Sequence, residues 1–498
     1  MFFGLSEEQE QFQDYVKKFL TDNVTVDEIR KIANGEDQAL QQEVYSGLIN
    51  LGINALLVPE EHGGLGADLL SAVAVAQGLG SGVGPIPFAG AYVMAPIALN
   101  LAGSEEQQKK YLPEIVSNQT KFGVGLSEYV AAREDAGIDL ANGKANGKAL
   151  FVIDGDQADY FLLANKGGVM FLVDANDKGL EKIKLTSVDK TRSYLELTLK
   201  NVAAEVLPNS ENDPELAKKV LDAGRIIFAA DSLGASETMI EKAVSYAKER
   251  KQFNRVIGSF QAVKHMCAEM ASDLEPCYAM LWQAAHSFDH APDEARLQAC
   301  QAKSHISEVA KMISKKATEV HGGMGFIEET GAAQHMRDAR ILPIYEGTNG
   351  IQSLDFIGRK CLRDGGVGLM QLIAKVEKTA SSSIFTSELT KSLLEKLSKA
   401  VGECKEGLEY ILANPDRAPT ISYNFMMLFG NTLSYWLLVR LAAEADKKIQ
   451  QGANDVFYKN KLSTASFFAS QILPRNSAYL EAVQDETEYD IGLGVMQN

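Results

Sequence analysis

The sequence predicts an α+β protein that is mainly α-helical and has four parts in succession. These are an N-terminal helical domain, a small middle β-barrel or sandwich, a C-terminal four-helix bundle, and an extra C-terminal helical bundle. Apolar residues recur every three to four positions in the first, third and fourth parts, as on one face of a helix. In the middle part, short apolar runs are separated by glycine-containing turns, which is the pattern of strands and hairpins.

The N-terminal helical domain is expected over residues 1–120. Ser6 and Gln9 have the spacing of a capping box, so a helix should begin just after Ser6. Residues 69–79 are apolar nearly all round, which predicts a helix that is buried on most of its sides. A later capped helix is expected to end at Pro113, because proline lacks the N–H that would continue the helix.

The middle β-domain is expected over residues 121–212. Short apolar runs occupy residues 149–153, 160–163 and 169–173. Residues 194–199 alternate between apolar and polar side chains, as in a strand with one buried face. A small antiparallel barrel or sandwich is the fold that such short strands and tight turns favour.

The C-terminal helical domain is expected over residues 213–366. Its pattern favours four long helices, at residues 214–251, 258–290, 293–322 and 331–340. Beyond this domain, three consecutive serines indicate a linker.

Residues 367–498 are expected to form an additional helical extension. The most apolar window of the chain, residues 421–439, lies in this extension and contains Asn424 and Asn431. A helix that spans a membrane needs about 20 mostly apolar residues. The polar residues therefore favour a buried core helix, and a membrane is not an expected partner.

Charge and cysteine usage argue against several classes of function. The chain has 498 residues, with 49 basic and 66 acidic side chains and a formal net charge of −17. No nucleic-acid partner is expected, because such a partner would need a basic surface. The five cysteines form no C-x-x-C pair and the seven histidines have no H-E-x-x-H spacing, so neither a disulfide framework nor a metal site is predicted. With no signal sequence at the start, these features favour a cytoplasmic location.

A candidate general base lies in the segment IYEGTNG, residues 344–350. Glu346 stands there between an apolar approach and a glycine-rich turn. Apolar surroundings disfavour the charged form of a carboxylate, which suits it to act as a general base. The neighbouring glycines let a ligand approach the backbone closely. The alternative interpretation is a solvated glutamate that caps the next helix.

Two further segments contain candidate cofactor contacts. In residues 246–261, Arg250 is suited to clamp a pyrophosphate, Phe253 to stack on a flat ring, and Gln261 to bond an adenylate or flavin edge. The glycine-rich segment that begins at His321 offers backbone N–H groups to a phosphate-bearing cofactor. Taken singly, both segments also fit ordinary helix ends, with basic residues near the helix C-terminus or glycine as its cap.

In their order and spacing, these segments resemble the acyl-CoA dehydrogenase family. The segments are PEEHGGLG at 59–66, RKQF at 250–253 followed by Gln261, HGGMGF at 321–326, MRDAR at 336–340 and YEGT at 345–348. The resemblance covers about the first 365 residues. It implies a FAD enzyme of fatty acid metabolism (β-oxidation) that desaturates an acyl-CoA thioester between Cα and Cβ.

The resemblance also implies roles for particular residues. Glu346 matches the catalytic base, which removes the α-proton while a hydride passes from Cβ to flavin N5. The residues that match contacts with FAD, some of them made across a subunit interface, are Arg250, Gln252, Phe253, Gln261, Glu319, His321, Gly322, Gly323, Thr348 and Gly350. The residues that match contacts with the substrate are Arg225, Tyr345 and Gly347.

The sequence departs from the family pattern at several positions. Glu319 stands where the family usually has glutamine, and Asn254 where it usually has glycine; asparagine tolerates the left-handed backbone conformation. Both tryptophans, Trp282 and Trp436, lie outside the middle domain, so the usual flavin-shielding tryptophan is missing. Flavin contacts from this domain are therefore expected to be rebuilt, weakened or lost.

The resemblance implies a homodimer or homotetramer that passes electrons to an electron-transfer flavoprotein. A second possibility is an acyl-CoA oxidase that uses oxygen, which a flavin without its tryptophan shield would favour. A third is a non-catalytic subunit that binds acyl-CoA or a partner without flavin, which the divergent middle domain would favour. Peroxide formation distinguishes the oxidase from the dehydrogenase. The flavin absorbance of the purified protein distinguishes both enzymes from the non-catalytic subunit.

Overall fold

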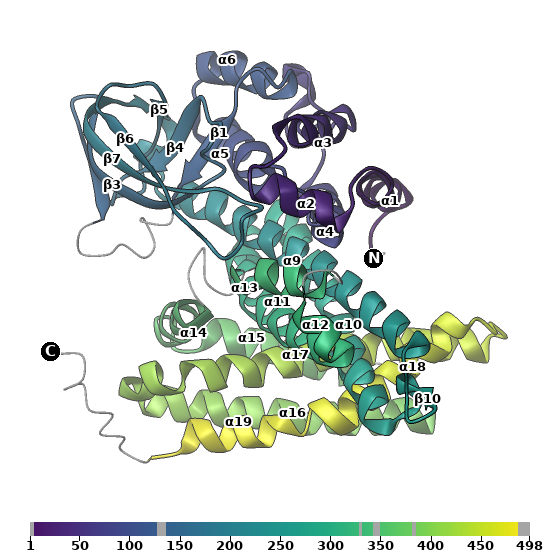
Figure 1. Cartoon of the computed structure of the whole chain (residues 1–498). Coiled ribbons are helices and arrows are strands. Elements are labelled where there is room, and N and C mark those ends of the chain that lie inside the picture. The colour runs from purple at the N-terminus through teal and green to yellow at the C-terminus, as the bar shows by residue number, and fades with distance from the viewer. Residues whose placement is uncertain (1–3, 127–135, 328–330, 342–348, 381–384, 487–498) are drawn as a thin grey trace, which may run out of the picture. The chain divides into compact units, whose positions relative to one another are not determined.

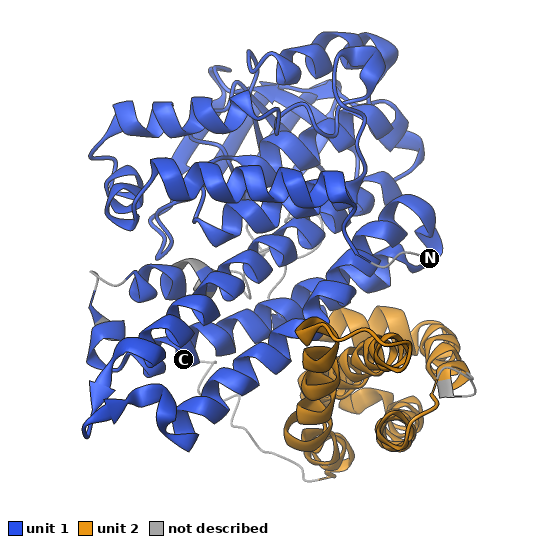
Figure 2. Ribbon diagram, turned by 90° about the vertical axis from the view of Figure 1, so that its right-hand side faces the viewer, with its two compact units in different colours: residues 1–352 blue, residues 353–498 orange. Residues whose placement is uncertain are grey.

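The computed structural model describes residues 4–126, 136–327, 331–341, 349–380 and 385–486. The chain divides into two compact units, Met1–Gln352 and Ser353–Asn498 (Figure 2). Helices form most of both units, and the middle of the sequence of unit 1 forms a β-sheet, at the upper left in Figure 1. The predicted fold class, mainly helical with a middle β-domain, is confirmed. The domain boundaries at residues 120, 212 and 366 stay predictions.

The first part of unit 1 is helical. Its elements are α1 (Glu7–Asn23), α2 (Val26–Ala33), α3 (Gln38–Asn50), the 3-10 helix η1 (Glu60–His62), α4 (Leu69–Ser81), the π-helix η2 (Phe88–Met94), α5 (Ala95–Ala102) and α6 (Glu105–Val116). The predicted capping box begins α1: Ser6 Oγ accepts from the Gln9 N–H, and Gln9 Oε1 accepts from the Ser6 N–H. As expected, α4 is buried along most of its length.

The predicted end of a helix at Pro113 is wrong. Helix α6 continues to Val116 with Pro113 inside it. Proline removes the hydrogen bond to the carbonyl four residues earlier, which belongs to Lys109. Both residues lie on the exposed side of α6, where water can bond to that carbonyl and the helix can continue.

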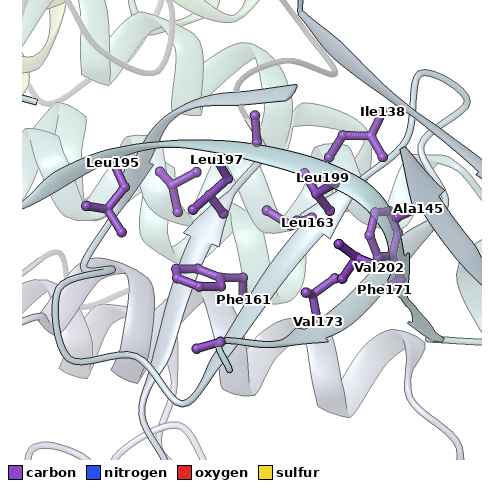
Figure 3. Packing of buried hydrophobic residues seen from close by; sticks show 13 residues of the cluster. Ile138, Ala145, Phe161, Leu163, Phe171, Val173, Leu195, Leu197, Leu199 and Val202 are labelled. Carbon is purple, nitrogen blue, oxygen red and sulfur yellow. The ribbon is translucent and has the colours of Figure 1, made fainter. Parts of the chain in front are cut away.

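Within the part of unit 1 that the structure describes, the sheet has eight strands. They are β1 (Phe122–Gly125), β2 (Gly137–Ala141), β3 (Lys144–Ile153), β4 (Tyr160–Ala164), β5 (Met170–Asp174), β6 (Leu180–Lys184), β7 (Tyr194–Ala203) and β8 (Glu205–Val206). The order is β6-β7-β3-β1-β4-β5-β8, with β2 paired to β3. Since β1 and β4 run parallel and the other pairs antiparallel, the sheet is mixed. Its core includes Phe161, Phe171 and Leu197 (Figure 3).

The last part of unit 1 is again helical. Its elements are α8 (Asn209–Asn212), α9 (Glu215–Glu249), the hairpin β9 (Lys251–Gln252) and β10 (Arg255–Val256), η3 (Ile257–Ser259), α10 (Gln261–His290), α11 (Pro292–His321), α12 (Gly323–Phe326), α13 (Ala332–Ile341) and the start of α14 (Asn349–Ile357). The long helices α9, α10 and α11 pack against one another (Figure 1).

Helices α4 and α9 approach each other closely at two glycines. A Cβ atom built on Gly80 would lie 2.1 Å from the carbonyl oxygen of Asp231. A Cβ atom built on Gly234 would lie 1.9 Å from the carbonyl oxygen of Gln77. The two backbones therefore touch, and no other residue type fits at either glycine without a shift of the helices.

Unit 2 contains η5 (Gly358–Leu362), α15 (Val367–Ala380), α16 (Glu388–Ala413), η6 (Pro415–Arg417), α17 (Ala418–Gln450), α18 (Val456–Phe467), η7 (Phe468–Ile472) and α19 (Arg475–Gln484). Helix α17 packs against α16, α18 and α19. By length and composition, Pro415–Gln450 could span a membrane, but 78% of its most apolar window is buried inside the protein. Thr432 on α17 accepts hydrogen bonds from Cys404 Sγ (3.2 Å) on α16 and Asn476 Nδ2 (2.8 Å) on α19.

Candidate functional site

The hairpin after α9 holds most of the predicted cofactor contacts of the first segment. Arg250 ends α9, and the strands β9 and β10 are joined by Phe253 and Asn254. Both turn residues have positive φ angles, 52° and 61°, which is the geometry of a tight hairpin turn that follows the strand twist. Asn254, which stands where the family usually has glycine, thus adopts the left-handed backbone conformation that this position requires.

The side chains of this hairpin face outward. Arg250, Gln252 and Gln261 are exposed, and 87% of Phe253 is accessible. The Phe253 ring meets the edge of Phe260, with ring centres 6.0 Å apart. The Arg255 guanidinium lies 3.9 Å from the centre of the Phe260 ring. A basic and aromatic surface is therefore available at the end of α9.

The second predicted cofactor segment ends α11. Glu319 is exposed, whereas His321 is buried, and its Nδ1 atom is 2.8 Å from the Ala317 carbonyl oxygen. Gly322 has a φ of 57°, and a Cβ built on Gly322 or Gly323 would meet no atom within 4 Å. The backbone of this turn is thus open to a ligand, while the histidine side chain packs inside.

The two predicted cofactor segments meet in the fold. The His321 ring stacks on Tyr246, with ring centres 4.7 Å apart and planes 28° apart. Tyr246 lies one helical turn before Arg250, and its carbonyl accepts a hydrogen bond from the Arg250 N–H (2.8 Å). Segments more than 60 residues apart in the sequence are therefore neighbours at the ends of α9 and α11.

Arg225, a predicted substrate contact, lies elsewhere on α9. It precedes Arg250 by 25 residues, which is about 38 Å along a helix that rises ~1.5 Å per residue. Arg225 is buried, and its Nη1 donates to Asp222 Oδ1 at 2.8 Å. Arg296 on α11 donates to the other oxygen of the same carboxylate at 3.0 Å. The structure thus places Arg225 in an ion pair within α9, and Arg296 links the same carboxylate to α11.

The predicted catalytic turn is outside the described residues. These positions are Tyr345, Glu346, Gly347 and Thr348. Gly350, a predicted cofactor contact, is described and is exposed as the second residue of α14.

The residue that follows this turn is firmly held. Asn349 is buried, and its Nδ2 donates to Glu308 Oε1 at 2.8 Å. Ser307 Oγ donates to Asn349 Oδ1 at 3.1 Å, and Lys311 forms an ion pair with Glu308. The start of α14 is therefore fixed to α11 by three polar residues, immediately after Thr348.

A small cavity lies where α4, η2, the end of β3 and α9 come together. Its volume is about 30 Å³. Its lining includes the apolar residues Leu79, Phe88 and Phe228 and the charged residues Asp154, Arg192 and Asp231. By the same measure a single water needs about 10–15 Å³, so the cavity has room for roughly two or three non-hydrogen atoms.

The charged residues of the cavity are organised by two interactions. Asp154 Oδ2 accepts a hydrogen bond from the Gly90 N–H at 2.7 Å. Arg192 Nη2 forms an ion pair with Asp231 Oδ1 at 2.7 Å. Burial raises the pKa of Asp154 to about 6, although the Gly90 hydrogen bond and the Arg192 charge act in the opposite direction.

Phe151 is a candidate functional residue that the sequence pattern did not indicate. It lies on β3 where the pairing with β7 shifts between Ala149 and Val152, and its φ is 52°. The side chain is 51% exposed in an otherwise largely buried strand segment. A bulky residue with positive φ is a genuine outlier, and bulges near active sites redirect side chains. The run at 149–153 contains no signal for this bulge, because its apolar residues fit a regular strand.

Among the residues that the structure describes, no group of three or more His, Cys, Asp or Glu side chains is placed to hold a metal ion. The five cysteines are free thiols, and four of them are buried.

Three family models match the chain. They are the acyl-CoA dehydrogenase N-terminal domain at residues 6–119, the acyl-CoA dehydrogenase C-terminal domain at residues 215–362, and the acetyl-CoA dehydrogenase C-terminal-like domain at residues 371–489. The third match extends the similarity into the region that the sequence pattern had set apart as an addition.

Characterised relatives agree with these matches. The chain is 26% identical to 3-methylmercaptopropionyl-CoA dehydrogenase of Ruegeria pomeroyi, over 89% of this chain and 85% of the relative. It is 29% identical to the caffeyl-CoA reductase–Etf complex subunit CarC of Acetobacterium woodii, over 70% of this chain and 95% of the relative. It is 28% identical to a short-chain-specific acyl-CoA dehydrogenase of Clostridium acetobutylicum, over 72% of this chain and 99% of the relative.

Solved structures share the fold. An acyl-CoA dehydrogenase from Bacillus anthracis, complexed with FAD, aligns with 99% of this chain and 91% of its own, at a TM-score of 0.82 and 20% identity. Butyryl-CoA dehydrogenase from Megasphaera elsdenii aligns with 71% of this chain and 97% of its own, at a TM-score of 0.63 and 26% identity. With the three family matches, these similarities lead to one conclusion: the chain belongs to the acyl-CoA dehydrogenase family and is a FAD-dependent oxidoreductase that acts on acyl-CoA.

Proposed function

We propose that this protein oxidises an acyl-CoA thioester between Cα and Cβ, with Glu346 as the base. One observation supports the proposal: two of the segments with predicted cofactor contacts, residues 250–261 and 319–323, are neighbours at the ends of α9 and α11. The stack of Tyr246 on His321 links the hairpin to the glycine turn. Segments that are distant in sequence thus form one surface, as a shared ligand requires.

The residues of this surface fit a flavin dinucleotide. Arg250 offers an exposed guanidinium, whose planar fork matches a pyrophosphate. Phe253 offers an exposed ring, and the open backbone at Gly322 and Gly323 offers close approach to a phosphate. FAD, when bound, supplies the hydride acceptor of the oxidation.

The chain itself supplies the base and its position. The Glu346 carboxylate takes the proton from Cα, and a hydride leaves Cβ, so that a double bond forms between the two carbons. The α-proton is weakly acidic and needs a polarised thioester carbonyl, a task for hydrogen-bond donors aimed at its oxygen. Asn349, bonded to Ser307 and Glu308, holds the chain three residues beyond Glu346.

The proposed assembly is a homodimer or homotetramer. Phe253 is 87% exposed on a turn whose two residues have positive φ, and Arg250, Gln252 and Gln261 beside it are also exposed. A second subunit would bury such a solvent-exposed aromatic ring. In the proposed assembly, the hairpin of one copy contacts the FAD of another.

The proposed electron acceptor is an electron-transfer flavoprotein. One relative is named as a subunit of a caffeyl-CoA reductase–Etf complex. A solved structure of an electron transferring flavoprotein of Acidaminococcus fermentans aligns with this chain at 27% identity and a TM-score of 0.62. We also propose a cytoplasmic location and a role in β-oxidation of fatty acids, and the five free cysteines support a reducing compartment.

An oxygen-using oxidase is the competing function, because the usual tryptophan shield of the flavin is missing. Phe151 favours the dehydrogenase over this alternative. Its partly exposed ring, at a strained bulge of the middle sheet, is suited to cover a flat ring system in place of tryptophan. An oxidase would form hydrogen peroxide in stoichiometric amounts when oxygen is the sole acceptor, whereas the dehydrogenase would not.

The decisive variant is Glu346→Gln, which keeps the size of the side chain and removes the base. Wild-type protein is expected to oxidise an acyl-CoA in anaerobic assays with an artificial acceptor. The variant should bind as much FAD as wild type and lose at least ~10²-fold in kcat, since general bases contribute about 10²–10⁴-fold. Full activity in Glu346→Gln would refute the assignment of the base, and a wild type without flavin would favour the non-catalytic subunit.

A further inference from the structure

The cavity between α4, the end of β3 and α9 is bounded in part by the two helices. Its lining includes Leu79 on α4 and Ile227 and Phe228 on α9. Beyond them the two helices touch through backbone, at Gly80 against Asp231 and at Gly234 against Gln77. A longer cavity would need α4 and α9 to separate, because no side chain lies between them there to be moved aside.

The charged residues that line the cavity are held by polar interactions. Asp154 caps the start of η2 through the Gly90 N–H, and a Cβ at Gly90 would lie 2.7 Å from the same carboxylate oxygen. The Arg192–Asp231 ion pair joins the loop before β7 to α9. Two carboxylates thus face one guanidinium, which leaves a net negative charge in the cavity lining.

The position of the cavity connects it with the site described above. Phe228 and Asp231 follow Arg225, a predicted substrate contact, by one and two turns of α9. Ile153, which also lines the cavity, lies two residues after Phe151, the strained aromatic residue of β3. Ligand sites commonly form in such concave junctions between structural layers.

We infer that this cavity receives the tip of the acyl chain and restricts the substrate to short, uncharged acyl groups. The inference rests on the proposed function. Room for roughly two or three atoms suits a chain of about four carbons, and a longer chain meets the contact between α4 and α9. An anionic tip meets the net negative charge of Asp154 and Asp231 against Arg192.

The test is a panel of thioesters with the purified FAD-containing protein. Because one misfitting methylene changes specificity by about 10–200-fold, kcat/KM for butyryl-CoA should exceed that for octanoyl-CoA at least tenfold. It should exceed that for glutaryl-CoA, which carries a carboxylate, by a similar factor. Equal or greater kcat/KM for octanoyl-CoA would overturn the inference and leave the proposed function intact. If no thioester is oxidised, the proposed function fails, and the inference fails with it.

A variant of the cavity wall tests the location directly. Phe228→Leu enlarges the cavity and should reduce the preference for butyryl-CoA over octanoyl-CoA at least fivefold. Phe288→Leu on α10 is the matched control, because Phe288 is equally buried but packs under Lys219, away from the cavity. An unchanged preference in Phe228→Leu, or an equal change in Phe288→Leu, would show that the cavity does not select the chain. If Phe228→Leu does not fold, the kcat/KM values of the wild-type protein for the thioesters still test the inference.

Discussion

Phe151 illustrates how one residue can carry functional information that a sequence pattern conceals. Within residues 149–153 it continues an apolar run and predicts only a buried strand position. In the fold it is half exposed, with a left-handed backbone that costs about 1–3 kcal/mol. The register shift against β7 that produces this conformation depends on long-range pairing, so no local pattern could predict it.

Substitution of Phe151 is expected to separate strain from function. Phe151→Gly should raise the free energy of unfolding by roughly 1 kcal/mol, because glycine adopts positive φ without cost. The same variant should lose flavin more easily and form more peroxide in air. Phe151→Trp should retain flavin. Ile183→Gly on β6, another exposed apolar position, is the control and should lower stability without a change in peroxide formation. Equal peroxide formation in Phe151→Gly and wild type would argue against contact with the flavin.

Asp154 should make stability depend on pH. Its pKa is about 6 in the folded chain, mainly because of burial, against an ordinary value of 3.8. Between about pH 4 and pH 6 the folded chain therefore holds this proton more tightly than the unfolded chain does. The resulting stabilisation is complete below about pH 4 and is lost as the pH rises through about 6.

Asp154→Asn is the corresponding experiment. The amide oxygen can still accept the Gly90 hydrogen bond, but it does not titrate. Between about pH 5 and about pH 8, wild type should lose on the order of 1 kcal/mol of unfolding free energy relative to the variant, since Asp154 is partly exposed. Urea unfolding at several pH values measures this difference. Parallel curves for the two proteins would contradict a raised pKa at Asp154.

At the scale of elements, helices followed from the sequence more faithfully than strands. The helices expected at 214–251 and 293–322 are α9, Glu215–Glu249, and α11, Pro292–His321. Local signals mark these ends, because a proline stands at the start of each helix, Pro214 and Pro292, and Gly322 follows the end of α11. The parallel pairing of β1 with β4 involves residues 38 apart and had no such signal. The π-helix η2 was likewise not predicted.

The junction of α11 and α14 is the element that should position the catalytic turn. Asn349→Ala removes the hydrogen bonds with Ser307 and Glu308 and should lower kcat at least tenfold, because misplacement by about 1 Å costs about 10²-fold. KM and FAD content should stay within about twofold of wild type. Asn414→Ala at the end of α16 removes a comparable amide in unit 2 and should leave kcat unchanged. A normal kcat in Asn349→Ala, or a parallel loss of FAD, would contradict a positioning role.

At the scale of the whole molecule, the sequence predicted a mainly helical protein with a middle β-domain, and the structure confirms it. The predicted family is also confirmed, and the match at 371–489 includes the C-terminal extension in it. The sequence did not reveal the strained, half-exposed Phe151 of the middle sheet. It also did not reveal the size of the cavity at α4 and α9, because both depend on contacts between distant segments.

The net charge of −17 gives local cationic groups added importance. Anionic ligands such as CoA and FAD meet an acidic molecule, so their phosphates need specific partners. Arg250 and the open turn at Gly322 and Gly323 are exposed and offer such partners at one end of unit 1. Arg225 is buried in an ion pair with Asp222, so its predicted contact with the substrate stays a prediction.

The visible absorption spectrum of the purified full-length protein, before and after anaerobic addition of butyryl-CoA, tests the central claim most directly. A protein that oxidises acyl-CoA with FAD will show the flavin bands on purification and will lose them when the thioester is added. Absence of flavin bands even after incubation with FAD, or bands that neither butyryl-CoA nor any other acyl-CoA bleaches, would contradict the account.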